Sequence, residues 1–308
     1  MQPELSIIII HYGSSALTET LVTQLAALPP APSREIIVVD NAAEIPFPAE
    51  EYARVRTIRL RENRGYGYAC NRGADVAQGA YLLVCNNDLE MKGNTLAALT
   101  ERCIEHPSVG AIGPRLHFPD GRFQLSWGNF PTLRSEFFER RRQRQSMGAG
   151  GGGLERREAA SAALRTVDWV TGACMLLPRK AWESVRGFDE RYFFYFEDVD
   201  LCMRLRRQGW GVLYDPSAEV LHHGGGSDPL RNPAIVVSYR REQLRYYARY
   251  NSALSYALLR RYLLWKFRRM HAAGVIDATL AGEVQDMIRN YSRTEERSQF
   301  HASEKRIS

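Results

Sequence analysis

Short apolar runs alternate with amphipathic stretches through the first third of the chain. The runs are rich in β-branched residues and cover residues 5–10, 35–39, 55–60, 80–85 and, more weakly, 109–113. Between them, one helical face carries Leu17, Leu21, Leu25 and Leu28, and another carries Leu96, Leu99 and Ile104. This alternation is typical of βαβ units, and continuous apolar strands indicate a sheet covered on both faces. The pattern predicts an α/β fold with a mostly parallel sheet flanked by helices.

The pattern changes at residues 139–158, where charged residues and a glycine tract displace most apolar side chains. We expect this segment to be mobile. Beyond it, the pattern predicts strands at 167–170, 174–177, 212–214 and 220–221, helices at 179–187 and 198–207, a long helix over 236–271 and a last helix over 276–291. The expected organisation is one domain over residues 1–228, with halves at about 1–118 and 166–228, followed by a C-terminal helical region over 229–308.

Composition places the chain among ordinary globular proteins. Its 308 residues suit one large α/β domain with an appendage, and 44% hydrophobic with 25% charged residues excludes a disordered or collagen-like chain. Five cysteines without a C-x-x-C pair indicate neither a disulfide framework nor a structural zinc site. We found no signal peptide and no apolar run near the ~18 residues of a membrane span. These features predict a cytoplasmic protein.

Basic residues are unevenly placed. Lys and Arg number 41 against 35 Asp and Glu, and many of the arginines lie in residues 139–158 and in the helix after 236. A genomic bias toward arginine is one interpretation. The placement favours an anionic surface or a phosphate-bearing substrate over nucleic acid. Tyrosines, leucines and Trp265 among these arginines suit a helix at the inner face of an anionic membrane, while packing on the first domain or on a second subunit of a homo-oligomer is the alternative.

Polar residues end the predicted strands, where α/β sheets bind ligands. His11 and Asp40 directly follow two of the apolar runs. Asn63, Gly65 and Asn71 lie in a glycine-containing loop that enters a helix, a setting that favours a phosphate. Its glycines do not have the spacing of the dinucleotide-binding fingerprint. For Asp40, a turn or helix-capping role is the alternative.

A second polar group closes the strand at 80–85. Asn86, Asn87 and Asp88 follow it, and a hard divalent cation often takes only one or two carboxylates, with phosphates and water completing its shell. His222 precedes a glycine run, and a neutral imidazole is a further ligand for such an ion. A strand-ending turn and a structural histidine are the alternatives.

The densest cluster of functional groups lies at residues 187–200. Six aromatic residues lead into three carboxylates, at Glu197, Asp198 and Asp200. Aromatic walls and like charges raise the pKa of a carboxyl group, which suits a general base. A capping box beside an aromatic core patch is the structural alternative.

Together, these motifs resemble the family 2 glycosyltransferases, in particular their rhamnosyltransferase-like branch. The resemblance covers about residues 5–228. It is carried by S-I-I-I-I-H-Y at the start, V-V-D-N at 38–41, N-R-G-Y-G-Y-A-C-N-R-G at 63–73, N-N-D-L-E at 86–90, G-A-C-M-L-L-P-R at 172–179, G-F-D-E-R-Y-F-F-Y-F-E-D-V-D-L-C-M-R at 187–204 and H-H-G-G-G-S at 222–227.

The resemblance implies a GT-A fold, with a nucleotide-binding first half and an acceptor-binding second half. It implies a donor site formed by His11, Asp40, Asn63, Gly65, Asn71, Asn86 and Asn87. It assigns Asp198, beside Glu197, as the catalytic base, and Asp200, Trp169 and Gly172 to the acceptor side. Asp88 and His222 would hold Mg²⁺ or Mn²⁺. Asn86 replaces the first acid of the D-x-D motif, so one carboxylate remains there and metal dependence is expected to be weaker.

The implied reaction is the inverting transfer of a sugar from a nucleotide-activated donor, such as dTDP-rhamnose, to a saccharide or lipid-linked acceptor. Such a reaction belongs to cell-surface polysaccharide or glycolipid synthesis. A sugar-phosphate nucleotidyltransferase is one alternative, but it would open with a glycine-rich basic loop where this chain has residues 11–15, H-Y-G-S-S. A non-catalytic saccharide-binding or scaffold protein is the other. The intact Glu197, Asp198 and His222 argue against it.

Overall fold

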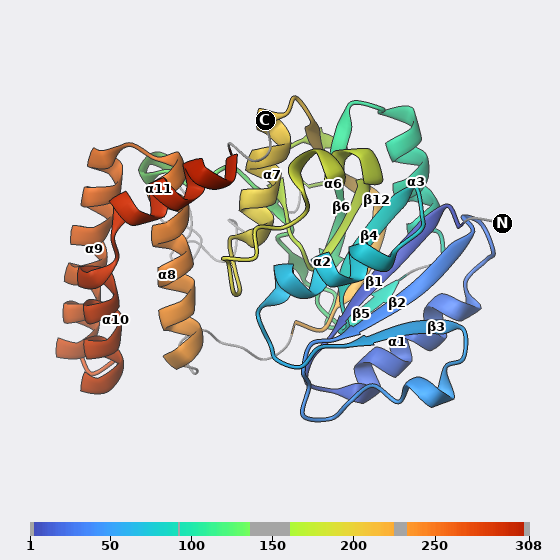
Figure 1. The fold of residues 1–308 in the computed structure, drawn as a ribbon, viewed down its shortest axis with the longest axis horizontal. Helices are drawn as coiled ribbons and strands as arrows, with labels where there is room; N and C mark the ends of the chain where they lie inside the picture. The colour runs from blue at the N-terminus through green and yellow to red at the C-terminus, as the bar shows by residue number, and fades with distance from the viewer. Residues whose placement is uncertain (1–2, 92, 136–160, 225–232, 305–308) are drawn as a thin grey trace. The chain divides into compact units, whose positions relative to one another are not determined.

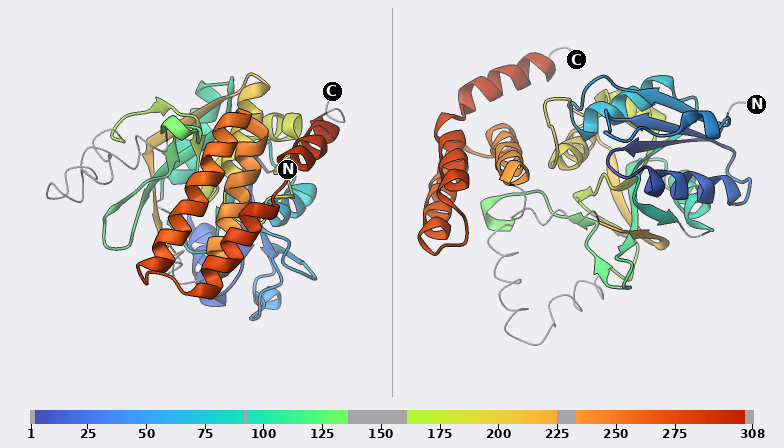
Figure 2. Two further views of the ribbon diagram at one scale, coloured as in Figure 1. Left: turned by 90° about the vertical axis from the view of Figure 1, so that its left-hand side faces the viewer. Right: turned by 90° about the horizontal axis from the view of Figure 1, so that it is seen from below.

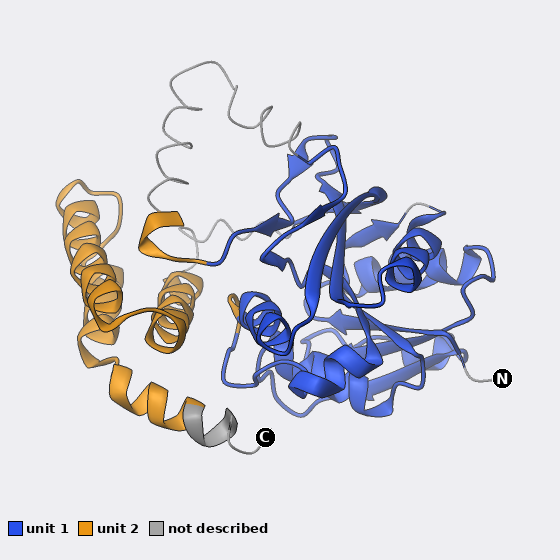
Figure 3. Cartoon of the chain, turned by 90° about the horizontal axis from the view of Figure 1, so that it is seen from above, with its two compact units in different colours: residues 1–130, 142–193, 197–225 blue, residues 131–141, 194–196, 226–308 orange. Residues whose placement is uncertain are grey.

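The structure, a computed structural model, describes residues 3–91, 93–135, 161–224 and 233–304. The predicted mobile segment at 139–158 lies outside the described residues. Internal contacts divide the chain into two compact units, which Figure 3 colours separately. The first comprises residues 1–130, 142–193 and 197–225, and the second comprises residues 131–141, 194–196 and 226–308.

The first unit is built on one sheet, whose strands in the described part of the chain follow the order β3-β2-β1-β4-β11-β6-β12-β5 (Figure 1). The strands are β1 (Leu5–His11), β2 (Arg34–Asp40), β3 (Val55–Arg59), β4 (Tyr81–Asn86), β5 (Leu89–Met91), β6 (Val109–His117), β11 (Cys174–Pro178) and β12 (Gly211–His222). β7 (Phe123–Gln124) pairs with β6 and β9 (Arg165–Thr166) pairs with β12, outside this order, and β8 (Trp127–Gly128) pairs with β10 (Trp169–Val170) in a separate ribbon. β3, β2, β1 and β4 are parallel, as are β6 and β12, while β11 and β5 run antiparallel to their neighbours.

Helices cover both faces of this sheet because inner strands such as β1 are apolar on both sides. Successive side chains of a strand point to opposite faces. Ile7 and Ile9 pack in one buried cluster with α1 (Ser15–Ala27) and α3 (Thr95–Glu105). On the other face, Ile8 and Ile10 share a cluster with α2 (Tyr66–Val76), α6 (Arg179–Val185) and α7 (Glu197–Arg207). A short 3₁₀ helix, η1 (Ala49–Glu51), precedes β3. The predicted α/β fold with a mostly parallel sheet is confirmed.

Two local predictions were wrong. The strands expected at 212–214 and 220–221 form one strand, β12, because the irregularity between them is absorbed as a bulge at Asp215, whose carboxylate accepts hydrogen bonds from the N–H and hydroxyl of Ser217. On α3, Ile104 is 58% exposed and Cys103 takes the buried position, since it lies four residues after Leu99 on the same helical face.

The second unit is helical, and the left view of Figure 2 shows three of its helices side by side. They are α8 (Pro233–Tyr250), α9 (Ala253–Ala272) and α10 (Ala278–Asn290), followed by α11 (Arg293–Glu304). The single helix expected over 236–271 was wrong. Two helices form in its place, because the helical conformation is interrupted at residues 251–252. There Ser252 takes an extended conformation and its side chain accepts a hydrogen bond from the N–H of Ser255, which caps the second helix. None of the described helices combines the length and hydropathy needed to cross a bilayer.

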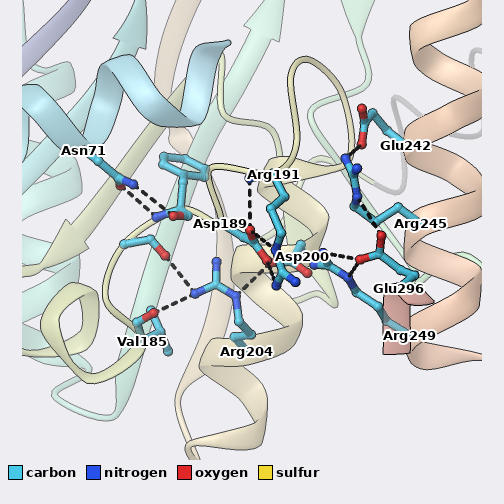
Figure 4. A network of polar contacts seen from close by, with 12 residues as sticks. Asn71, Val185, Asp189, Arg191, Asp200, Arg204, Glu242, Arg245, Arg249 and Glu296 are labelled. Atoms are coloured by element: carbon cyan, nitrogen blue, oxygen red, sulfur yellow. Dashed lines mark hydrogen bonds and ion pairs between the residues drawn. The ribbon is translucent and has the colours of Figure 1, made fainter. Parts of the chain in front are cut away.

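Buried ion pairs account for part of the arginine in this unit. Glu296 of α11 accepts hydrogen bonds from Arg245 and Arg249 of α8, and Glu242 pairs with Arg245 (Figure 4). Although burial alone would raise the pKa of Glu296, the two guanidinium groups lower it below the ordinary value. These arginines hold helices together and are not available to a partner.

Candidate active site

The parallel strands bring the predicted polar residues to one edge of the sheet. In the β1–β2 register, His11 lies opposite Asp40, and in the β1–β4 register Ile10 lies opposite Asn86. The carboxyl ends of these strands, and the loops that follow them, therefore form one polar rim. This is the edge at which α/β sheets bind their ligands.

His11 and Asn87 form the framework of this rim. The Nε2 atom of His11 is 2.8 Å from the carbonyl oxygen of Ile45, so this nitrogen donates, and in a neutral ring Nδ1 then accepts from the Thr18 hydroxyl at 2.7 Å. The Thr18 oxygen in turn accepts from the Asn87 amide at 2.9 Å. Asn87 also donates to the carbonyl groups of Tyr12 and Ser14. Both side chains thus hold the loop after β1, and direct donor contact by either stays a prediction.

Asp40 and Asn63 are linked through Asn41. The Asn41 amide donates to Asn63 Oδ1 at 3.1 Å, and the same oxygen accepts from the N–H of Gly65 at 2.9 Å. Asp40 is buried, one of its oxygens accepts from the N–H of Ala43, and the other lies 3.8 Å from Arg59 Nε. The loops after β2 and β3 therefore form one connected surface.

Gly65 allows a close backbone approach that joins this surface to the 187–193 loop. Its φ is +104°, and a Cβ there would lie 2.3 Å from the carbonyl oxygen of Phe193. The N–H of Tyr66 donates to that same oxygen at 3.0 Å. Only glycine fits this position, both for conformation and for space.

Asn71 makes a second junction with the same loop (Figure 4). Its amide donates to the carbonyl oxygen of Phe188 and to Glu190, and its Oδ1 accepts from the N–H of Phe188, all at 2.9–3.0 Å. These contacts use the polar atoms of Asn71 inside the protein. Asn71 therefore holds the 187–193 loop against α2, and we call this role a clasp. Contact between Asn71 and the nucleotide sugar stays a prediction.

Asp88 and His222 lie side by side where β4 and β12 end. Asp88 Oδ1 is 3.3 Å from His222 Nε2, and Asn86 Nδ2 lies 3.2 Å from the same nitrogen. His222 Nδ1 lies 3.0 Å from Gln124 Oε1, an acceptor, so a neutral His222 carries its proton on Nδ1. Nε2 then carries a lone pair, which can accept from the Asn86 amide and which lies 3.3 Å from Asp88 Oδ1.

This donor set fits a divalent cation. Two electron-rich atoms, one from a carboxylate and one from an imidazole, lie together among buried residues, and a bound cation would interact favourably with both. The described residues contain no cluster of three or more His, Cys, Asp and Glu able to hold a metal. Further ligands would have to come from phosphate oxygens and water, as Mg²⁺ commonly requires.

Asp198 stands in the first turn of α7 and its carboxylate is oriented by backbone groups. Oδ2 accepts from the N–H of Gly172 at 3.0 Å, and Oδ1 accepts from the N–H of Val199 at 2.8 Å. Burial raises the pKa of Asp198 above the ordinary carboxyl value, and these two bonds together with the Thr171 hydroxyl oppose the rise. The result is a fixed carboxylate with increased basicity.

The backbone at 172–173 links Asp198 to the group formed by Asn86, Asp88 and His222. Gly172 donates to Asp198, and the carbonyl oxygen of the next residue, Ala173, accepts from the N–H of Asn86 at 3.0 Å. The Tyr66 hydroxyl donates to the Gly172 carbonyl at 2.6 Å. Burial, the neighbouring Cys70 and Cys85 thiols and the charge of Glu197 hold the pKa of Tyr66 well above its usual value, so it remains a donor.

The other predicted residues have different surroundings. Glu197 is buried at the start of α7. Asp200 is fully buried and bonds Arg204, which also donates to the carbonyl groups of Val185 and Gly187 (Figure 4). Trp169 donates its indole N–H to the Asn129 carbonyl. Asp200 therefore anchors the 185–187 turn, and acceptor contact by Asp200 or Trp169 stays a prediction.

Two strained residues precede the carboxylates. Tyr195 and Phe196 have φ values of +75° and +66°, a left-handed conformation that aromatic residues rarely adopt. Such a conformation costs on the order of 1–3 kcal/mol per residue and is concentrated at functional sites. It sets the direction in which the chain enters Glu197 and Asp198.

Family comparisons agree with this arrangement. The model of glycosyl transferase family 2 matches residues 6–162, and that of glycosyl transferase family group 2 matches residues 155–281. The N-acetylglucosaminyl-diphospho-decaprenol L-rhamnosyltransferase of Mycobacterium tuberculosis is 31% identical over 246 residues, which cover 74% of this chain and 80% of that protein. An O-antigen biosynthesis protein from Myxococcus xanthus is 30% identical over 73% of this chain, but this chain spans only 18% of it.

Solved structures show the same fold. A mannosyltransferase from Pyrobaculum calidifontis, in complex with GDP-mannose and Mn²⁺, matches with a TM-score of 0.54 and 17% identity over 80% of this chain and 64% of its own. GalNAc-T7, in complex with UDP, GalNAc and Mn²⁺, matches with a TM-score of 0.56 and 15% identity over 80% of this chain and 50% of its own.

The fold is therefore GT-A, and the chain is a glycosyltransferase. It belongs to glycosyl transferase family 2, and it is similar to rhamnosyltransferases within it.

Several residues of the site escaped prediction from the sequence. Three of them contribute hydroxyl groups from helix or loop segments whose sequence shows no unusual feature, and they are Thr18, Tyr66 and Thr171. The fourth, Gln124, lies in a two-residue strand. Tyr66 did lie in a motif, between Gly65 and Gly67, and that placement was the one available signal. Gln124 is 98 residues from His222, so nothing local marks it.

Replacing Asn71 with alanine tests whether it is a clasp. We expect Asn71→Ala to lower the free energy of unfolding by about 1–3 kcal/mol, because the N–H and carbonyl of Phe188 lose their partner. Thermal melting and nucleotide-sugar titration would be measured on the same sample. Unchanged melting with lost nucleotide-sugar binding would instead make Asn71 a donor ligand.

Proposed function

We propose that the protein transfers a sugar from a nucleotide-activated donor to an acceptor hydroxyl with inversion at the anomeric carbon. The observation that carries this proposal is the oriented carboxylate of Asp198, linked through Gly172 and Ala173 to the polar group at Asn86, Asp88 and His222. A base and a diphosphate-binding group at one sheet edge are what a single displacement requires.

In this reaction the acceptor oxygen attacks the anomeric carbon and the bond from that carbon to the diphosphate oxygen breaks. The acceptor proton passes to Asp198, and the bonding electron pair leaves on the diphosphate. The N–H groups of Gly172 and Val199 hold the carboxylate in place, while its raised pKa makes it a better proton acceptor than an exposed aspartate. Asn63 and the backbone around Gly65 would contact the donor.

Asp88 and His222 are the residues that would hold Mg²⁺ or Mn²⁺, with Asn86 beside them. Such an ion, when bound, stabilises negative charge on a diphosphate. Gln124 would fix the His222 ring so that Nε2 points toward Asp88.

The proposal for the donor and the acceptor rests on the names of the relatives. The M. tuberculosis relative is named as a rhamnosyltransferase acting on a diphospho-decaprenol carrier, which supports dTDP-rhamnose or a similar donor and a lipid-linked saccharide acceptor. We further propose that the reaction serves cell-surface polysaccharide synthesis and takes place at the cytoplasmic face of the membrane. The alternative of a sugar-phosphate nucleotidyltransferase is not supported, because the chain belongs to glycosyl transferase family 2.

A donor screen with an Asp198 variant tests the function. Nucleotide sugars that include dTDP-rhamnose, UDP-sugars and GDP-sugars are screened for a melting shift with Mg²⁺ or Mn²⁺. We expect Asp198→Asn to keep donor binding and to lose about 10²–10⁴ in transfer rate. Glu183→Gln, an exposed carboxylate on α6, is the matched control and should transfer normally. Normal turnover by Asp198→Asn would exclude it as the base. If no nucleotide sugar binds, the scaffold alternative gains support.

The pH profile tests the environment of Asp198. The base must be ionised, so activity is lost as pH falls through its pKa. Because the Thr171 hydroxyl lowers that pKa, Thr171→Val should raise it and move the acid limb of kcat/KM to higher pH. Thr171→Ser retains the hydroxyl and should keep the native profile. An acid limb that does not move in Thr171→Val would belong to another group.

Calorimetry with Mn²⁺ and a nucleoside diphosphate tests the metal site. We expect Asp88→Asn to weaken metal-dependent binding, and Gln124→Ala to weaken it by about 10–100-fold through the orientation of His222. Glu90→Gln is the control, since Glu90 lies two residues from Asp88 but pairs with His223. Equal affinity for all variants with and without Mn²⁺ would remove Asp88 and His222 from the metal site.

A further inference from the structure

α9 has two apolar faces, and only one of them packs against other helices of the second unit. Tyr256, Leu259, Leu263 and Phe267 recur at helical spacing and are buried. α9 packs with this inner face against α8 and α10. A surface helix needs one such face, so the apolar residues on the opposite side are not explained by packing within the unit.

The outer face of α9 combines exposed apolar and basic side chains. Leu254, Leu258 and Trp265 are spaced by four and seven residues, which places them on one side of the helix, and they are 69%, 46% and 53% exposed. Arg261, Arg268 and Arg269 fall on the same side and are exposed. We call these six residues the outer face.

Charge selects the partner. The α9 sequence, Ala253–Ala272, contains five Arg and Lys residues and no Asp or Glu. Among the described residues, Arg261 and Arg268 form no ion pair, and the Arg269 guanidinium lies 5.3 Å from the centre of the Trp265 ring. The outer face therefore offers its positive charge outward. A second copy of the same face would be repelled, because a two-fold contact places like charges opposite one another.

We infer that the outer face of α9 lies on the surface of an anionic lipid bilayer. Leu254 and Leu258 would enter the headgroup region, Trp265 would take the interfacial position that indole rings prefer, and the arginines would meet lipid phosphates. A nucleic acid would leave the leucines against phosphate. The inference rests on the proposed function for its purpose, since a lipid-linked acceptor is confined to that surface.

Vesicle flotation of the full chain tests the inference. Vesicles of phosphatidylcholine alone are compared with vesicles that also contain phosphatidylglycerol. Wild-type protein should float with the anionic vesicles. Each arginine near such a surface contributes about 1 kcal/mol, or roughly fivefold in binding, so the triple variant Arg261→Gln, Arg268→Gln, Arg269→Gln should bind on the order of a hundredfold more weakly.

Two further variants isolate the cause. Leu254→Ser, Leu258→Ser, Trp265→Ser keeps the charge and should also lose vesicle binding, because the apolar contact is removed. Arg54→Gln, Arg56→Gln, Arg122→Gln removes equal charge from exposed positions of the first unit and should float like wild type. All the substituted side chains are exposed, and thermal melting verifies that each variant is folded.

Several results would overturn the inference. They are failure of wild-type protein to float, equal loss in the first-unit control, wild-type binding to DNA that is lost with the same variants, or a wild-type dimer that they dissociate. Nucleotide-sugar binding in solution separates the two proposals. Flotation without donor binding would remove the proposed function alone, and donor binding without flotation would remove this inference alone.

Discussion

The 187–193 loop lies against the beginning of α2, and the geometry of the site depends on that contact. The Phe193 carbonyl accepts from Tyr66 at a distance that leaves no room for a side chain at Gly65, and Asn71 bonds the Phe188 backbone on both sides. The same few residues that border the loop at Asn63 and Gly65 therefore hold the segment leading to Asp198. Chemistry in which a base meets a donor sugar requires that these parts be fixed relative to each other.

Buried carboxylates in this protein have two different kinds of surroundings. Around Asp198 burial raises the pKa, which increases basicity, and backbone N–H groups keep the carboxylate ordered. Around Asp200 and Glu296, buried carboxylates are matched by arginines, and each pair connects separate segments of the chain. Carboxylates that look alike in the sequence thus differ in their chemistry because of their neighbours. The cluster at 197–200 contains both kinds.

The basic excess also separates into two groups. Arg245 and Arg249 are internal, whereas Arg261 and Arg268 face outward beside exposed leucines. Counting charges could not distinguish them, since both groups lie in one arginine-rich stretch. The break at Ser252 assigns them to different helices, and each helix then has its own inner and outer face.

The sequence by itself determined the layered α/β fold, the family and most of the polar residues at the strand ends, because apolar periodicity and short motifs are local signals. It also predicted α7 and α10 to within a few residues, since their helical periodicity is a local signal as well. Tertiary structure decided what those polar residues do. Asn71 meets Phe188 across 117 residues, and His222 meets Gln124 across 98. The partner of a hydrogen bond at such a separation leaves no periodic trace in the chain, so only folding reveals whether a side chain remains available for a substrate or is used within the protein.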